Sequence, residues 1–209
     1  MRYSYYKDTL KNYVKNNYKE YLLVCFLLLI GVFVGVMIIN NCKDAQLTEI
    51  TSYIKDFITK YKEIENINIS SLIIDSIKKN LLFAIILWLA GTTVIGMLIV
   101  LIMILLRGII LGFTVSSITI ALGFFKGTVF TISSILLQNL LYIPAILTIG
   151  VSSIKLYKSI IKDKRRENIK IEIIRHTIIS FFMVILIVIS VFIESFISIK
   201  LLKNIIKYF

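Results

Sequence analysis

Residues 80–106 read NLLFAIILWLAGTTVIGMLIVLIMILL, a run of 27 residues without a charged side chain. The same 209-residue chain holds four more uncharged runs of at least 18 residues, at 21–42, 108–125, 127–154 and 176–193. About 18 consecutive apolar residues are enough for a helix to cross a bilayer. The sequence therefore predicts an all-α polytopic membrane protein with about five transmembrane helices. A mean hydropathy of +0.89 excludes a soluble or disordered chain.

The apolar runs and the charges between them divide the chain into nine segments. We expect a basic cytoplasmic leader, transmembrane helix 1, an extracytoplasmic segment, transmembrane helices 2, 3 and 4, a basic cytoplasmic loop, transmembrane helix 5 and an interfacial tail. Their predicted ranges are 1–20, 21–42, 43–79, 80–106, 108–125, 127–154, 155–176, 177–199 and 200–209.

Charged residues gather at the predicted membrane edges. The net charge is +12, and eight of the 24 Lys and Arg residues lie within 155–176. Basic clusters beside apolar spans attract anionic lipid head groups, so we expect anionic lipid as a partner and no nucleic acid. Because cytoplasmic loops carry an excess of Lys and Arg, this cluster predicts a cytoplasmic N-terminus and an extracytoplasmic C-terminus.

Between 43 and 79 the chain becomes charged and amphipathic. Six apolar residues recur there at alternating spacings of three and four, which places them on one helix face. This predicted seam consists of Leu47, Ile50, Ile54, Phe57, Tyr61 and Ile64. A second helix is predicted to start near Ser70 and to run into the second span, giving a helical hairpin. The seam either rests as a lid on the protein's own spans or docks an extracytoplasmic partner.

Glycines occur in pairs within the apolar runs. Three pairs have the spacing G-x-x-x-G: Gly31 and Gly35, Gly108 and Gly112, and Gly123 and Gly127. Such pairs let helix backbones approach closely in a membrane. Three pairs in one chain favour close internal packing over the alternative, a homodimer.

The run 127–154 carries a polar feature near its middle. Gln138 and Asn139 lie there, and Pro144 follows and takes away a backbone donor. An unpaired amide is costly in hydrocarbon. We therefore predict a kinked fourth helix whose amides either hold helices together or line a polar cavity.

Three charged residues stand within or next to the apolar runs. Arg107 separates two of the runs and is predicted to lie in a cytoplasmic turn. Glu194 lies in the last predicted span, and a carboxylate there needs a partner. Lys126 is the predicted partner of Glu194, because both would lie near the outer membrane surface.

The sequence lacks the residue patterns of an active site. It has no Ser/His/Asp or Cys/His set, no P-loop and no metal-ligand spacing around its single histidine, His176. We therefore expect no enzymatic activity, no cofactor and no metal.

The order of these features resembles the stage II sporulation protein M family over roughly residues 20–200. The resemblance rests on FLLLIGVFVGV at 26–36, on the charged segment after it, and on the run from residue 80 that contains Arg107-Gly108 and Gly112-Phe113. It also rests on LLQNLLYIPA at 136–145. Relatives often have proline at the position of Leu137, so the start of the local break departs from the family pattern.

The resemblance implies a non-catalytic scaffold in the mother-cell membrane at the sporulation septum of endospore-forming bacteria. Family members hold together two peptidoglycan-degrading partners, stage II sporulation proteins D and P, whose wall cutting supports engulfment of the forespore. Other members are linked to transport, so a membrane subunit of a transporter or permease-like complex is the alternative.

Overall fold

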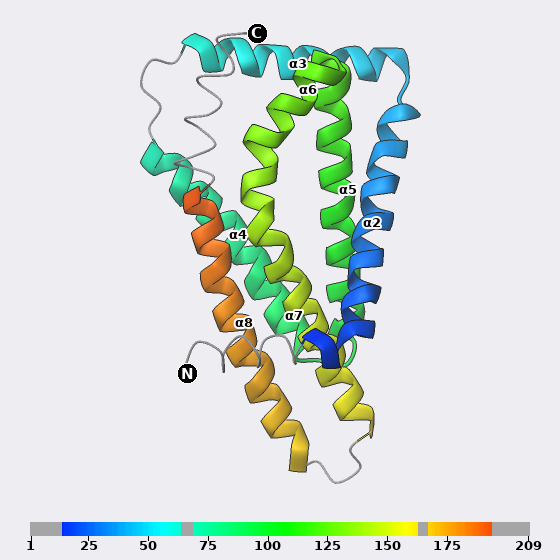
Figure 1. Cartoon of the computed structure of the whole chain (residues 1–209), viewed down its shortest axis with the longest axis vertical. Coiled ribbons are helices and arrows are strands. Elements are labelled where there is room, and N and C mark those ends of the chain that lie inside the picture. The colour runs from blue at the N-terminus through cyan, green and yellow to red at the C-terminus, as the bar shows by residue number, and fades with distance from the viewer. Residues whose placement is uncertain (1–13, 64–68, 163–166, 194–209) are drawn as a thin grey trace.

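The computed structural model of the chain is a bundle of long helices with one further helix lying across its end (Figure 1). It describes residues 14–63, 69–162 and 167–193. No strand occurs within these ranges, and the predicted all-α class is confirmed. Predictions for Ile64, Glu194 and the segments 1–13, 163–166 and 195–209 lie outside the described residues.

The helical elements follow one another with short connections. They are α2 (Tyr18–Asn40), α3 (Asp44–Glu63), α4 (Ile69–Gly91), α5 (Gly96–Leu122), α6 (Phe124–Thr131), the π-helical turn η1 (Ile132–Leu136), α7 (Leu137–Lys162) and α8 (Glu167–Ile193).

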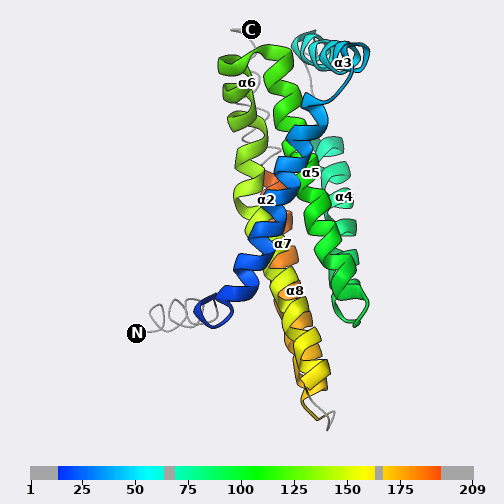
Figure 2. The same ribbon diagram turned by 90° about the vertical axis from the view of Figure 1, so that its right-hand side faces the viewer.

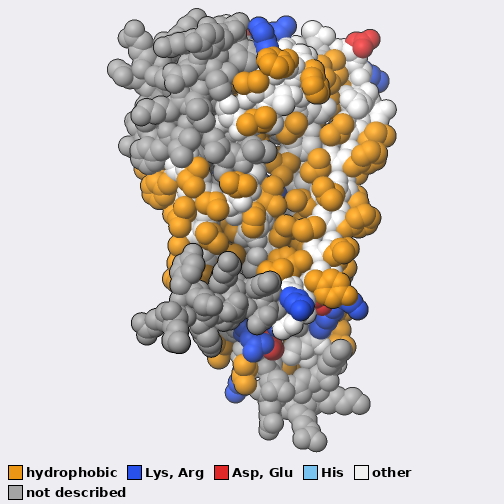
Figure 3. All heavy atoms as spheres, in the orientation of Figure 1, with side chains coloured by type: hydrophobic (Ala, Val, Ile, Leu, Met, Phe, Trp, Pro, Cys, Tyr) orange, Lys and Arg blue, Asp and Glu red, His pale blue; other side chains and the backbone are white. Residues whose placement is uncertain are grey.

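Four stretches are long and apolar enough to cross a membrane. They are Tyr18–Asn40, Gly96–Leu122, Asn139–Ile161 and Ile169–Ile193. The chain is thus a multi-pass membrane protein by the length and composition of its helices. Figure 3 agrees with this, because hydrophobic side chains cover the visible middle of the molecule while Lys and Arg gather towards its two ends. A fifth crossing, by α4, stays a prediction.

Helix α5 lies at the centre of the packing, since it contacts α2, α3, α4, α6 and α7. Its closest neighbour is α2, which runs beside it in both ribbon views (Figures 1 and 2). The two helices meet through two of the three glycine pairs. A Cβ atom built on Gly31 would lie 3.0 Å from the Cα atom of Gly108, and one on Gly112 would lie 2.9 Å from the Cα atom of Val32.

This contact forms within a single chain. Lipid tails are as apolar as leucine, so helices in a bilayer associate through close van der Waals packing rather than through the hydrophobic effect. Any side chain in place of these glycines would collide with backbone atoms, which cannot rotate away. The third pair has another use, because Gly123 has φ +82° and ends α5 at a sharp turn.

The uncharged run 80–106 contains a helix boundary that the sequence did not reveal. Helix α4 ends at Gly91 and α5 begins at Gly96. In the turn, the hydroxyl of Thr92 donates to the carbonyl of Leu89 at 2.7 Å, and the hydroxyl of Thr93 accepts from the amide of Gly96 at 3.0 Å. Threonine hydroxyls thus satisfy backbone groups that the helix ends leave free, so no charge marks the turn.

Arg107 therefore lies inside α5, 11 residues after its first residue, and the prediction of a turn at Arg107 is wrong. In place of the predicted spans 80–106 and 108–125, the structure has α4, from Ile69 to Gly91, and α5, which is continuous from Gly96 to Leu122.

Residues 127–154, the predicted fourth span, are divided between α6, the π-helical turn and α7. Helix α6 starts at Phe124, α7 continues to Lys162, and the part long and apolar enough to cross a membrane is Asn139–Ile161. The departure from α-helical geometry is the π-helical turn at 132–136, upstream of Pro144, and the ribbon changes direction between α6 and α7 (Figure 1). The predicted basic loop 155–176 is also helical at both ends, because α7 and α8 extend into it.

Replacing Gly108 by valine should lower the free energy of unfolding by about 1–3 kcal/mol, because the new side chain would push α2 away from α5. The matched control is Ile110→Val on the same helix, where the side chain is 55% exposed and faces outward. Both variants are compared by reversible unfolding in detergent micelles. Equal losses in the two variants would show that α2 and α5 do not depend on the glycine contact.

Candidate functional site

Helix α3 is held across the end of the bundle by the turn that precedes it. The side-chain amide of Asn41 donates to the carbonyl of Met37 at 2.8 Å and closes the end of α2. The backbone amide of Lys43 donates to the side-chain carbonyl of Gln46 at 3.2 Å, which satisfies a free group at the start of α3. With both helix ends satisfied, the chain leaves α2, and α3 runs crosswise to α5 at this end of the bundle (Figures 1 and 2).

The first half of the predicted seam faces the protein's own helices. Leu47, Ile50 and Ile54 are half-buried, and Ile58, which was not predicted, is buried in a cluster with Ile118 of α5 and Phe130 of α6. Phe57 is 48% exposed instead. The side chain of Tyr61 lies outside the described part of the structure, as does Ile64.

The shift from Phe57 to Ile58 has a geometric cause. The predicted seam alternates three and four, a period of 3.5 residues, which matches a supercoiled helix. A straight α-helix has 3.6 residues per turn, so its buried stripe drifts away from such a seam. The next buried residue after Ile54 is therefore Ile58, four positions on, and not Phe57. The lid interpretation accounts for this half of the seam.

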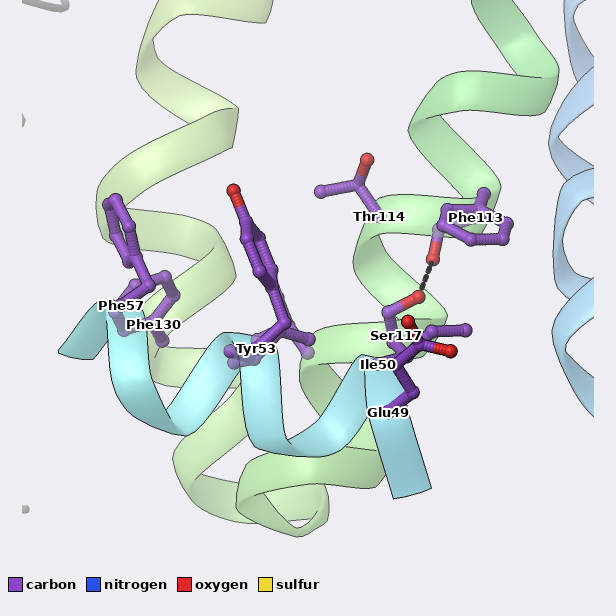
Figure 4. A pocket seen from close by; sticks show the side chains of 10 residues that line it. Glu49, Ile50, Tyr53, Phe57, Phe113, Thr114, Ser117 and Phe130 are labelled. Atoms are coloured by element: carbon purple, nitrogen blue, oxygen red, sulfur yellow. Dashed lines mark hydrogen bonds between the residues drawn. The ribbon is translucent and has the colours of Figure 1, made fainter. Parts of the chain in front are cut away.

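A cavity of about 540 Å³ remains between α3, α5 and α6. Figure 4 shows Tyr53 reaching from α3 into the space between the two other helices, with Phe57 and Phe130 on one side and Phe113 and Thr114 on the other. The cavity lies in the apolar part of the fold and is bounded on the outer side by α3.

The second group of predicted residues lies in the middle of the bundle. The guanidinium carbon of Arg107 lies 4.3 Å from the ring centroid of Tyr142 on α7, within the range of a cation–π interaction. Phe83 of α4 packs against the other side of this region, with its ring centroid 6.5 Å from that of Tyr142. Arg107 thus joins α5 to α7 at the level of the glycine contact, because it directly precedes Gly108.

The amide of Asn139 is buried and bonds locally. Its side-chain nitrogen donates to the carbonyl of Ile135 at 2.8 Å, inside the π-helical turn. Within the described residues, the side-chain oxygens of Asn139 and Tyr142 and the Nε of Arg107 are buried without a hydrogen-bond partner. The neighbouring Gln138 belongs to α7, but its side chain lies outside the described part of the structure. Of the predicted polar residues, the structure therefore brings Arg107 to α7 and leaves Asn139 bonded within its own helix.

Thr148, one turn after Pro144 on α7, contacts another helix. Its hydroxyl donates to the carbonyl of Pro144 at 2.7 Å, and it also lies 3.2 Å from the hydroxyl of Tyr21 on α2. This contact links α2 to α7. Lys126, the predicted partner of Glu194, is exposed near the start of α6. Their pairing stays a prediction.

Sequence reasoning missed the part played by His176. This buried residue of α8 has its Nε2 atom 3.3 Å from the carbonyl of Trp88 and its Nδ1 atom 3.0 Å from the hydroxyl of Ser152. A carbonyl can only accept, so Nε2 carries the proton and Nδ1 accepts from the serine. The amide of Thr92 bonds to Leu89 instead of Trp88, which leaves the Trp88 carbonyl free for the histidine.

His176 therefore caps α4 and ties it to α7 and α8. The indole nitrogen of Trp88 adds a hydrogen bond to Thr177 at 3.3 Å. The signal in the sequence was weak, because it consisted of one histidine and scattered hydroxyl residues in separate apolar runs. The described residues contain no group of His, Cys, Asp and Glu that could hold a metal ion.

The opposite end of the molecule from α3 carries ion pairs. Lys158 of α7 pairs with Glu20 of α2, and Arg175 pairs with Glu172 on α8. Both cations are about half exposed, and such pairs contribute roughly 0–1 kcal/mol each. The pair of Lys158 and Glu20 joins the ends of α7 and α2, whereas the pair of Arg175 and Glu172 lies within α8.

Together these features define a multi-pass helical membrane protein in which Arg107 and His176 link different helices and which carries an amphipathic helix at one end. The model of the family described as stage II sporulation protein M matches residues 23–199. The chain belongs to this family, which confirms the resemblance found in its sequence and implies a sporulation membrane protein. The chain matches no curated protein and no solved structure.

Replacing Tyr142 by leucine should remove the cation–π contact, whereas Tyr142→Phe keeps the ring and serves as the matched control. In a double-mutant cycle with Arg107→Met, we expect a coupling energy of about 0.5–2 kcal/mol for Tyr142→Leu and less for Tyr142→Phe. Reversible unfolding in detergent measures both. Strictly additive losses for Arg107→Met and Tyr142→Leu would contradict the contact.

Proposed function

We propose that the protein is a non-catalytic membrane scaffold that assembles peptidoglycan-degrading enzymes at the sporulation septum, with α3 as the element that meets them. Family membership supports the sporulation setting. The fixed position of α3 across the end of the bundle is the single observation that carries the docking role. A helix anchored in this way offers its outer face to a partner without having to fold on binding.

The charges support an extracytoplasmic position for α3. Basic residues concentrate at the other end of the bundle, where α7 and α8 extend beyond α2 and carry Lys155, Lys158, Lys170 and Arg175. This end is therefore cytoplasmic in the proposal, where it also meets anionic lipid. In this orientation α4 crosses the membrane as the fifth span, and the C-terminus is extracytoplasmic.

The docking surface differs from the one first expected. Because the residues from Leu47 to Ile58 that face inward hold α3 in place, the surface for a partner consists of exposed residues on the remaining faces of α3. They include Thr48, Ser52, Lys55, Asp56 and Thr59. The partners in the proposal are stage II sporulation proteins D and P, which act in the same extracytoplasmic space.

Charge reversal on this surface should reduce recruitment without affecting insertion. We expect Lys55→Glu to lower the septal localisation of fluorescently tagged protein D or P several-fold in sporulating cells, because charges at the rim of an interface steer association. Lys170→Glu is the matched control, since it makes the same change on an exposed lysine at the other end of the bundle. Immunoblots of membrane fractions should show equal amounts of both variants.

If the variant bearing Lys55→Glu and Ser52→Arg together still recruits both partners normally, the outer face of α3 is not the docking surface. If septal localisation of the partners survives deletion of the whole protein, the scaffold role itself is wrong.

A further inference from the structure

The cavity beneath α3 has a lining suited to an apolar occupant. Its walls are mainly aromatic and branched aliphatic side chains, among them Ile54 and Phe57 of α3, Phe113 and Ile118 of α5, and Phe130 of α6. Its volume of about 540 Å³ falls within the range of small-molecule sites in proteins. A space of this size inside an otherwise packed fold needs an occupant or loses contacts along its lining.

Two hydroxyl groups in the wall use their donors within their own helix. Thr114 donates to the carbonyl of Ile110 at 2.7 Å, and Ser117 donates to the carbonyl of Phe113 at 2.7 Å. The second of these bonds is the dashed line in Figure 4. These two side chains therefore offer only acceptors to the cavity. The remaining polar groups of the lining, on Glu49 and Tyr53, both belong to α3.

The cavity is open to the surroundings of the bundle. Two lining residues of α3 reach the surface, since Tyr53 is 74% exposed and Phe57 is 48% exposed. The facing wall belongs to α5, which is long and apolar enough to cross a membrane. An opening beside a membrane-spanning helix is accessible to acyl chains.

The volume also limits which apolar group can enter. An α-helix with its side chains is about 10–12 Å wide and rises 5.4 Å per turn, so one turn occupies at least roughly 400 Å³. The cavity holds little more than one such turn, too little for a partner's helix crossing the membrane. A thin, flexible hydrocarbon chain fits the available space.

We propose that this cavity is a lipid site that holds an acyl chain of a membrane phospholipid, with α3 as its lid. The bound chain fills the contact between α3 and the bundle that the protein's own side chains leave incomplete. The position of α3 then depends on the membrane in which the protein sits.

Filling the cavity with protein atoms tests this proposal. The full chain is reconstituted with palmitoyl-oleoyl phosphatidylglycerol, extracted in mild detergent and analysed by native mass spectrometry for retained phospholipid. Thr114→Phe, which puts a ring into the wall of the cavity, should reduce retention by roughly tenfold. Ile110→Phe is the matched control one turn along α5, outside the lining, and should retain lipid as the unmodified protein does. Equal retention by both variants would overturn the proposal.

A thiol placed in the wall gives a second measurement that does not require a bulky substitution. Ser117→Cys is made in a chain that carries Cys25→Ala and Cys42→Ala. A dodecyl methanethiosulfonate should label the thiol, a charged trimethylammonium analogue should not, and added phosphatidylglycerol should slow the labelling. Fast labelling by the charged reagent would show a water-filled cavity. Protection that persists after delipidation would place a protein segment there. Either result contradicts the lipid site.

Discussion

The contact between the glycines of α2 and α5 is the constraint on which the rest of the structure depends. Gly31 and Gly35 of α2 lie against Gly108 and Gly112 of α5. Because none of them has a side chain, the backbones of the two helices are in direct contact. This brings the end of α2 to the end of α5, so that the short turn after Asn40 places α3 crosswise beside α5. The contact reaches the site under α3, because a Cβ atom on Gly35 would lie 2.7 Å from the backbone nitrogen of Phe113, which lines the cavity.

Buried polar residues also hold helices of the bundle together. In hydrocarbon each unsatisfied polar group is costly, and two of the buried polar residues described in the bundle join different helices. Arg107 lies over the ring of Tyr142 and links α5 to α7, while His176 accepts from Ser152 and donates to Trp88, linking α8 to α7 and α4. Both residues thus contribute to the packing of the bundle.

Much of the fold could be predicted from residue patterns, and the errors have physical reasons. Uncharged runs predicted the all-α membrane class, and charge density predicted which end is basic. The boundary at Gly91–Gly96 was missed because threonine hydroxyls satisfy its backbone groups without any charge. The prediction of a turn at Arg107 failed because charged residues usually mark the membrane edge, whereas this one lies over the ring of Tyr142 on α7.

The site was predicted less well than the fold, because it depends on contacts between helices. Sequence spacing located α3 and its inward-facing residues up to Ile54, but a period of 3.5 instead of 3.6 placed Phe57 on the buried face where Ile58 lies. The capping role of His176 could not be seen, because its partners lie in two other apolar runs. The family match agrees with the sequence resemblance and covers residues 23–199.

Cross-linking α2 to α5 tests the central claim most directly. Val32→Cys and Ile109→Cys, both next to the paired glycines, are introduced together into a chain carrying Cys25→Ala and Cys42→Ala, and the membranes are treated with a short bis-maleimide. The account predicts a cross-link within one chain, seen as a faster-migrating monomer whose yield does not depend on protein concentration. A dimer band that grows with concentration would show that the glycines join two copies of the chain, and would contradict it.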